Sequence, residues 1–251
     1  MTEMSDLETY RGRYNRKLMY TVIILAASIV VAFSSIFINR YTGLTFGVSW
    51  DVFWAHVNGC SYGEYYYDLI IWDYNVPRAI MGVFVGAGLG VGGAVMQSLL
   101  RNPLADPYTT GVASGASFGV ALFLMLDICL LPVDMYAENL TLNAALFALI
   151  PTVAIVLISR RPNMTPTTTI LVGVAIMFVF RAGTSLMTIL ADPDAVEQLY
   201  LWNVGTLVKA DWNNIWLVAG ATTLCTVILM ILSYQMTIMT TGEKSDRKSV
   251  V

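Results

Sequence analysis

The sequence predicts an all-α protein, a polytopic transmembrane helical bundle. Composition indicates this class, because apolar residues make up 57% of the chain and charged residues only 12%, with a mean hydropathy of +0.66. A water-soluble domain carries charge on roughly a quarter of its residues. Long stretches with almost no charge also recur along the chain, so lipid is the expected solvent of most side chains.

The apolar stretches that predict spans are long enough to cross about 30 Å of hydrocarbon as helices. Helices are the expected form, because lipid offers no partner for a free backbone amide and the alternating pattern of a membrane barrel is not seen. We predict six spans, at Leu18–Ile38, Val76–Leu100, Tyr108–Leu126, Leu140–Ser159, Pro166–Leu190 and Trp212–Met239. A seventh run, Gln198–Val208, is too short to span and predicts an interfacial or re-entrant helix.

Lysine and arginine concentrate on one side of the predicted spans. Ten of the fourteen basic residues fall on the side of the N-terminus: Arg11, Arg13, Arg16, Lys17, Arg101, Arg160, Arg161, Lys244, Arg247 and Lys248. Since cytoplasmic loops retain positive charge, we expect a multi-pass protein of the inner cell membrane with both termini in the cytoplasm. The predicted division is a cytoplasmic tail at 1–17, a transmembrane domain at 18–240 and a cytoplasmic tail at 241–251.

Residues that could carry chemistry are few. His56 is the only histidine, which excludes a histidine-cluster metal site and makes a polar loop residue the expected role. Cys60 and Cys129 fall on the predicted outer, oxidising side and are either bridged or free. The sequence has no Walker A loop, no Gly-x-Ser-x-Gly elbow and no pair of carboxylates within a span. We therefore expect no catalytic site, no metal and no cofactor bound by this chain.

The predicted outer segment between the first two spans, residues 39–75, is rich in tyrosine, tryptophan and phenylalanine. One interpretation is an aromatic belt at the level of the lipid headgroups. The other is a surface for an extracytoplasmic partner, and the two interpretations are compatible.

Glycines recur at helical spacing in two of the predicted spans. They stand four residues apart at Gly82, Gly86 and Gly90, and again at Gly111 and Gly115. Small residues at this spacing let helix backbones approach closely in lipid, where dispersion and polar contacts drive association. We therefore predict a helix-packing role for these glycines, which is a structural role common in membrane proteins.

The string from Val76 to Gly119 is the most informative part of the sequence. It resembles the FecCD/BtuC family of ABC importer permeases, the type II importers of iron siderophores, haem and cobalamin. Three blocks carry the resemblance: Val76-Pro77-Arg78, then Gly92-Gly93-Ala94-Val95-Met96-Gln97 running into Arg101-Asn102-Pro103-Leu104-Ala105-Asp106-Pro107, then Gly111-Val112-Ala113-Ser114-Gly115-Ala116. Segments 171–175, 190–194 and 201–207 also look like family segments, so the resemblance covers nearly the whole chain.

The resemblance implies a BtuC-like permease that works by alternating access. ATP would be used by a separate cytoplasmic ABC ATPase subunit. The other implied partners are an extracytoplasmic substrate-binding protein, a second permease copy in a homodimer and the lipid bilayer, with no nucleic acid. The expected cargo is an iron chelate, as a siderophore or haem, or cobalamin, and the sequence does not choose among them.

The resemblance also implies roles for residues at the two ends of the second span. Arg78, at its outer start, is the candidate for docking the binding protein, although Asn75 stands where the family has another arginine. At the other end, Asn102-Pro103 and Asp106-Pro107 stop the helix, because a residue before proline avoids helical geometry. These four residues form either a capped reversal or a gating turn at the inner mouth of the path.

Arg181 lies about midway along the fifth predicted span. A lone cation is costly there unless it faces water or a partner. The family implies that this span lines the central pathway, so Arg181 either lines the path, pairs with another group or reaches toward the interface. The family pattern has no arginine here, so the residue is not carried over from it.

The chain departs from the family in length. Family members have about ten spans, whereas six are predicted here, and the resemblance fades after Gly242-Glu243-Lys244. The expectation is a permease truncated after its sixth span, with an unrelated tail at 245–251 of the kind that a frameshift, an early stop or a split gene produces. The alternative function is a non-transporting truncated or accessory membrane fragment of such a permease.

Overall fold

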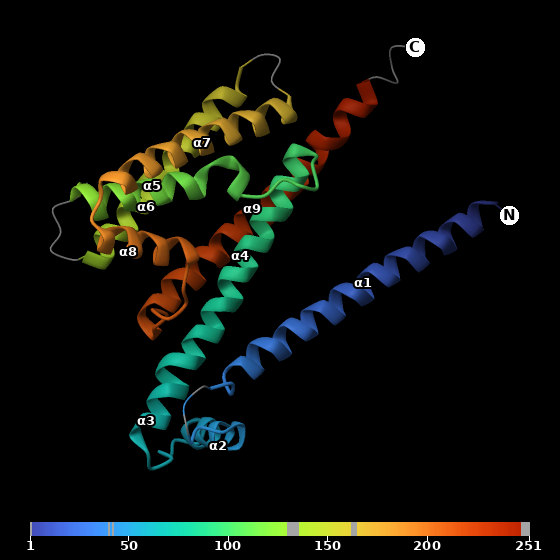
Figure 1. Ribbon diagram of the computed structural model, residues 1–251. Helices are drawn as coiled ribbons and strands as arrows, with labels where there is room; N and C mark the ends of the chain where they lie inside the picture. The colour runs from blue at the N-terminus through green and yellow to red at the C-terminus, as the bar shows by residue number, and fades with distance from the viewer. Residues whose placement is uncertain (1, 40, 42, 130–135, 162–164, 247–251) are drawn as a thin grey trace. The chain divides into compact units, whose positions relative to one another are not determined.

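The computed structural model describes residues 2–39, 41, 43–129, 136–161 and 165–246, which form helices and no strand (Figure 1). The end of the predicted C-terminal tail, 247–251, lies outside the described residues. The helices are α1 Thr2–Ser35, α2 Phe46–Val57, α3 Tyr65–Asp68, η1 Leu69–Asn75, α4 Val76–Leu100, η2 Tyr108–Thr110, α5 Val112–Leu126, α6 Tyr136–Ser159, α7 Pro166–Leu190, α8 Pro193–Val204 and α9 Trp212–Asp246. The chain divides into two compact units, residues 1–85 with 207–221 and residues 86–206 with 222–251.

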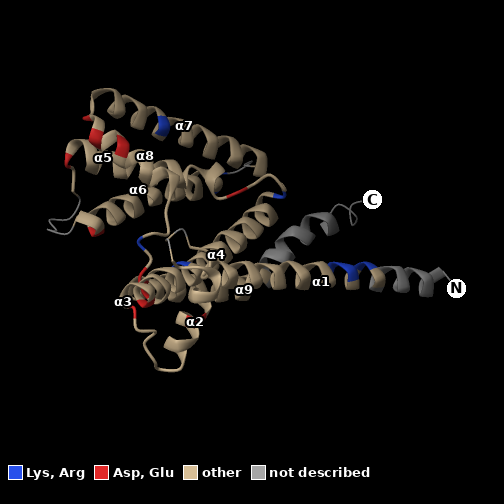
Figure 2. Cartoon of the chain, turned by 60° about the horizontal axis from the view of Figure 1, so that its bottom comes forward, with Lys and Arg blue, Asp and Glu red and all other residues tan. Residues whose placement is uncertain are grey.

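Within the described residues, five helical segments are long and apolar enough to cross a membrane: Gly12–Ser35, Tyr65–Leu100, Tyr136–Ser159, Pro166–Leu190 and Trp212–Ser233. They coincide with five of the six predicted spans, although the second begins at Tyr65 instead of Val76. Charged positions lie in the loops, near helix ends and in the N-terminal half of α1, with a further blue position in the body of α7 (Figure 2). That position is Arg181, the only charged residue of α7.

The third predicted span is shorter than the sequence suggests. Its first residues form the 3-10 turn η2, and Gly111 then takes a left-handed conformation at φ +82° before α5 begins. The 15 residues of α5 rise about 22 Å at 1.5 Å per residue, less than the hydrocarbon thickness of about 30 Å. Instead of meeting lipid along its length, α5 is extensively buried among its neighbours.

The first unit has its core where α2 and η1 pack on the end of α1. The buried residues there are Ile36, Phe37, Leu44, Val52, Ile71 and Val76. α2 begins after Thr45, whose hydroxyl accepts a hydrogen bond from the N–H of Val48, as expected of a threonine N-cap. Aromatic rings extend this core, with Phe37 and Trp50 centroids 5.3 Å apart. Part of the aromatic content of segment 39–75 is thus used for internal packing.

The second unit is built around α5, which packs against α6, α7 and α8 (Figure 1). Its buried core consists of Val120, Ala121, Ala144 and Leu199. The last of these belongs to α8, the short helix predicted at 198–208. α8 begins five residues earlier than predicted, because Pro193 fits the first turn of a helix. It ends at Gly205, where φ is +77°.

Candidate functional site

The second span begins with a segment of rare geometry. Tyr65–Leu100 is one continuous helical run, but its part η1 is π-helical. The N–H of Val76 accordingly bonds to the carbonyl of Ile71, five residues back. Short π-helical segments inside α-helices are frequent at functional sites, so the residues around η1 are candidates for a role beyond packing.

Pro77 leaves a carbonyl of this segment without its helical donor. In the π-helical series the next acceptor is the carbonyl of Trp72, and proline has no N–H to give it. The indole Nε1–H of Trp212 donates to that carbonyl instead, at 3.1 Å. The start of α9 is therefore joined to η1 by a hydrogen bond that the Val-Pro sequence makes available.

Arg78, the candidate docking residue, follows directly on this proline. Its guanidinium carbon lies 5.5 Å from the ring centroid of Tyr74, a cation–π distance. The side chain is half-buried, and among the described residues its Nε has no hydrogen-bond partner. The ring therefore holds the guanidinium in place while one donor remains unused.

Asn75 occupies the position where the resemblance leads one to expect a second arginine, and it has a structural function. Its side-chain amide donates to the carbonyl of Ile36 at 3.0 Å and to Oδ1 of Asn39 at 2.6 Å. These bonds tie η1 to the segment that follows α1. A docking contact at this end of the span would therefore depend on Arg78 rather than on a pair of cations.

Gly111 and Gly115 lie where helix backbones approach closely. A Cβ built on Gly111 would lie 3.2 Å from the backbone nitrogen of Met177 and 3.3 Å from the carbonyl oxygen of Gly173, both on α7. A Cβ on Gly115 would lie 2.7 Å from the carbonyl oxygen of Phe147 on α6. At both positions the obstacle is backbone, so a side chain cannot be accommodated by a change of rotamer.

The glycines of α4 have more space. A Cβ on Gly82 would meet only the side chain of Leu207, at 3.5 Å, and at Gly86 and Gly90 the described chain places nothing within 4 Å. Gly88, between them, would contact Thr222 on α9 at 3.4 Å. The face that carries Gly86 and Gly90 is therefore unoccupied by the described part of the chain, and its packing role remains a prediction.

The turn after α4 is organised by the side chains of Asn102 and Asp106. Oδ1 of Asn102 accepts from the N–H of Leu104 at 2.9 Å. Oδ1 of Asp106 accepts from the N–H of Thr109 at 2.8 Å, and the hydroxyl of Thr109 donates back to the carbonyl of Asp106. These are Asx-turn and capping contacts, which hold a reversal without regular structure.

The two prolines of this turn have different surroundings. Pro103 is exposed, whereas Pro107 is half-buried and precedes η2. The ring of Pro107 lies against Gly92, where a Cβ would be 3.6 Å from it. The turn is thus packed back onto α4 at one end and open at the other.

Arg181 is exposed on α7, and the described chain gives it no hydrogen bond or ion pair. Thr184, Ser185 and Thr188 follow it at three, four and seven residues, which places all four on one side of the helix. Two of these hydroxyls donate to the carbonyls of their own helix, Thr184 at 3.0 Å and Thr188 at 2.8 Å. α7 therefore carries a narrow polar stripe that ends in an unpaired cation.

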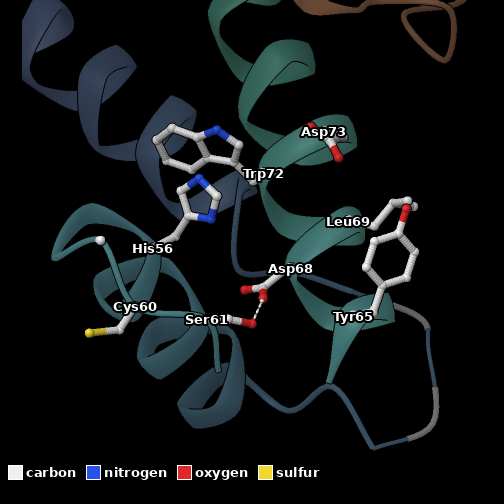
Figure 3. A pocket seen from close by; sticks show the side chains of 9 residues that line it. His56, Cys60, Ser61, Tyr65, Asp68, Leu69, Trp72 and Asp73 are labelled. Atoms are coloured by element: carbon white, nitrogen blue, oxygen red, sulfur yellow. Dashed lines mark hydrogen bonds between the residues drawn. The ribbon is translucent and has the colours of Figure 1, made fainter. Parts of the chain in front are cut away.

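Sequence reasoning missed a cavity beside η1. It has a volume of about 350 Å³ and is lined mainly by His56, Ser61, Tyr65, Asp68, Trp72 and Asp73 (Figure 3). The mixture of acidic and aromatic residues in segment 39–75 is a signal that could have indicated it, but the sequence does not show which of them meet. Cys60, at the cavity edge, and Cys129 are both free and exposed.

The donor side chains at the cavity are not grouped as a metal centre would require. In the described ranges no three His, Cys, Asp or Glu side chains are grouped so that they could hold a metal ion.

Comparison with known proteins identifies what the chain resembles. Residues 27–248 match the model of the FecCD transport family. The chain is 38% identical over 150 residues to the vitamin B12 import system permease protein BtuC of Serratia proteamaculans, covering 60% of this chain and 44% of that protein. It is 32% identical over 176 residues to the hemin transport system permease protein HmuU of Yersinia pestis, covering 69% of this chain and 52% of that protein.

A solved structure of a metal-chelate type ABC transporter in an inward-facing conformation shares the fold. The TM-score is 0.69 at 23% identity, and the alignment covers 94% of this chain and 68% of that chain. The chain spans about half the length of the curated relatives it matches. Five helices of spanning length together with these relatives make it an integral membrane protein.

Proposed function

Because the chain belongs to the FecCD transport family, we propose that it acts as the transmembrane permease subunit of an ABC importer in the inner membrane. Its cargo is an iron chelate, as a siderophore or haem, or cobalamin. The observation that carries this proposal is the family match over residues 27–248. Relatives named as vitamin B12 and hemin permeases support the class of cargo.

The mechanism is alternating access driven from outside this chain. A cytoplasmic ABC ATPase hydrolyses ATP, an extracytoplasmic binding protein delivers the cargo, and a second permease copy completes the path as a homodimer. This chain provides helices and binds no cofactor. The absence of a Walker A loop from the sequence supports a separate source of ATP hydrolysis.

Both termini face the cytoplasm in this proposal. The support is the distribution of charge, since basic residues lie in the N-terminal half of α1, directly after α4 and directly after α6, and positive charge is retained on the cytoplasmic side. With this orientation the cavity beside η1 and Arg78 face outward. The turn of Asn102 and Asp106 then lies at the inner mouth, where its capped geometry serves gating.

Arg181 lines the translocation path. The support is its exposure within an apolar helix and the polar stripe of hydroxyls beside it. An unpaired cation in the middle of a span is stable when it faces water or a counter-charge. Carboxylate or phenolate groups of an anionic chelate supply that counter-charge during passage.

The proposal is tested with the native locus deleted and the chain supplied on a plasmid. We expect restored growth on one iron chelate or on cobalamin as the limiting source, and retention of an ATPase when the tagged chain is purified. An empty plasmid is the control. A chain that retains an ATPase without restoring uptake supports the alternative of an accessory or truncated fragment. A chain that does neither refutes the importer function.

A further inference from the structure

The cavity beside η1 has aromatic walls. The imidazole of His56 stacks on the indole of Trp72, with ring centroids 4.2 Å apart and planes inclined by 26°. The ring of Tyr65 stands on the other side of the cavity, as Figure 3 shows. Aromatic faces of this kind attract cations and stack well on a planar guanidinium.

The carboxylate of Asp68, in the wall of this cavity, is only partly satisfied. Its Oδ2 accepts a hydrogen bond from the hydroxyl of Ser61 at 2.8 Å. Its Oδ1 is buried and has no hydrogen-bond partner among the described residues. A buried carboxylate oxygen without a donor is costly. Because Asp68 lines the cavity, a cation held there would compensate its charge and lower this cost.

Charge around the cavity also favours a cation. Segment 39–75 carries four acidic residues and one basic residue, and two of the acids, Asp68 and Asp73, line the cavity. Asp73 is exposed, so its carboxylate is available to a group that approaches from solvent. The same charges repel an anionic chelate, which makes the cavity unsuitable as a site for anionic cargo.

Its place in the chain indicates where the cation comes from. Asp68 and Asp73 precede Arg78 by ten and five residues on one continuous helical run. This end of the span therefore carries an acidic cavity and a guanidinium close together in sequence. A partner surface that carries a basic side chain next to an acidic one would be complementary to both. A small free cation would have no use for Arg78.

We propose that this cavity receives an arginine or lysine side chain of the extracytoplasmic substrate-binding protein. The proposal rests on the importer function and its orientation. The basic side chain enters between Tyr65 and the His56–Trp72 stack, donates to Asp68 and pairs with Asp73. Arginine fits better than lysine, because its planar group can stack on the rings and hydrogen-bond to a carboxylate at the same time.

The single histidine of the chain gives a direct test. The full chain, with a tag that contains no histidine, is placed in lipid nanodiscs with ¹³C-labelled histidine, and arginine amide is added. We expect a saturable shift of the His56 ring signal in the millimolar range, and none with the neutral analogue glutamine amide. Absence of a saturable shift, or equal shifts with both amides, overturns the proposal.

Two acidic variants locate the binding. Asp68→Asn keeps an oxygen acceptor for the hydroxyl of Ser61. It is expected to weaken the binding of arginine amide roughly tenfold or more. Asp51→Asn is the matched control, because Asp51 is exposed in the same segment and does not line the cavity. If Asp68→Asn alters the His56 signal before any amide is added, the substitution has disturbed the cavity itself, and Asp73→Asn is used as the test variant instead. Native affinity in these cavity variants overturns the assignment.

In a further experiment, the substrate-binding protein of the same importer is added to the nanodiscs in place of arginine amide. We expect it to shift the His56 signal and to be displaced in part by excess arginine amide. If the binding protein attaches to the nanodiscs while His56 is unchanged, the docking assignment fails and the importer function stands. If no binding protein attaches and no ATPase is retained, both fail.

Discussion

Replacement of Gly119 by alanine tests the contact between α5 and α6. A methyl group there would lie 2.5 Å from the carbonyl oxygen of Asn143 and 2.7 Å from Cβ of Phe147, well inside van der Waals contact. Asn143 has little freedom to move, since it is 1% exposed and its side chain donates to the carbonyl of Ile128 at 2.7 Å. Overpacking of this kind costs about 1–3 kcal/mol.

The matched control is Gly90→Ala, on α4, where nothing in the described chain lies within 4 Å of the new methyl. Alanine gains up to about 1 kcal/mol over glycine in a helix, and this gain cancels when the two variants are compared. The remaining difference is about 1–3 kcal/mol. For a chain of this size, each kcal/mol lowers the thermal midpoint by about 2–4 °C. Thermal unfolding in nanodiscs should therefore give Gly119→Ala the lower midpoint. A midpoint equal to or above that of Gly90→Ala would refute the close approach of the two helices.

Three further predictions concern single side chains. Trp212→Phe removes the indole donor to η1 and should lower stability in thermal unfolding by about 1–3 kcal/mol. The control Trp216→Phe, at a position that is 71% exposed, should change stability by less than about 0.5 kcal/mol. Equal effects of the two substitutions would contradict the role of the hydrogen bond. Asp106→Ala should lower stability by about 0.5–2 kcal/mol through loss of the cap, and Asp106→Asn, which keeps an acceptor oxygen, should recover most of it. Arg181→Gln should slow uptake of an anionic chelate with no change in thermal midpoint, and Arg181→Lys should retain uptake; native transport by Arg181→Gln would exclude Arg181 from the path.

The sequence predicts helices well where a long apolar run ends at a strong local signal. α7 begins and ends at the predicted residues, and α4 ends where predicted, because proline or a charged turn marks each of these boundaries. The helical run that contains α4 begins eleven residues earlier than the predicted span, at Tyr65. α6 begins at Tyr136 instead of Leu140. The difference arises because Asn139, which looks like a loop residue, is buried within the helix.

Other features depend on contacts that a sequence does not reveal. The π-helical geometry of η1 cannot be read from Leu69–Asn75, since the same residues are compatible with an α-helix. The partner of the free carbonyl in η1 is Trp212, 140 residues away. The cavity beside η1 likewise requires the end of α2 to return to η1, which places His56 on Trp72. The residue types at this end of the span are therefore evident in the sequence, whereas their arrangement is not.

The hydrogen bond from Trp212 to the carbonyl of Trp72 has a consequence for membrane insertion. The two residues are separated by 140 positions, and synthesis proceeds at about 5–20 residues per second, so Trp212 emerges roughly 7–28 s after Trp72. During that interval the carbonyl at the start of the second span has no protein donor and is left to water or to an insertion chaperone. This end of the span is thus completed only after translation has reached α9.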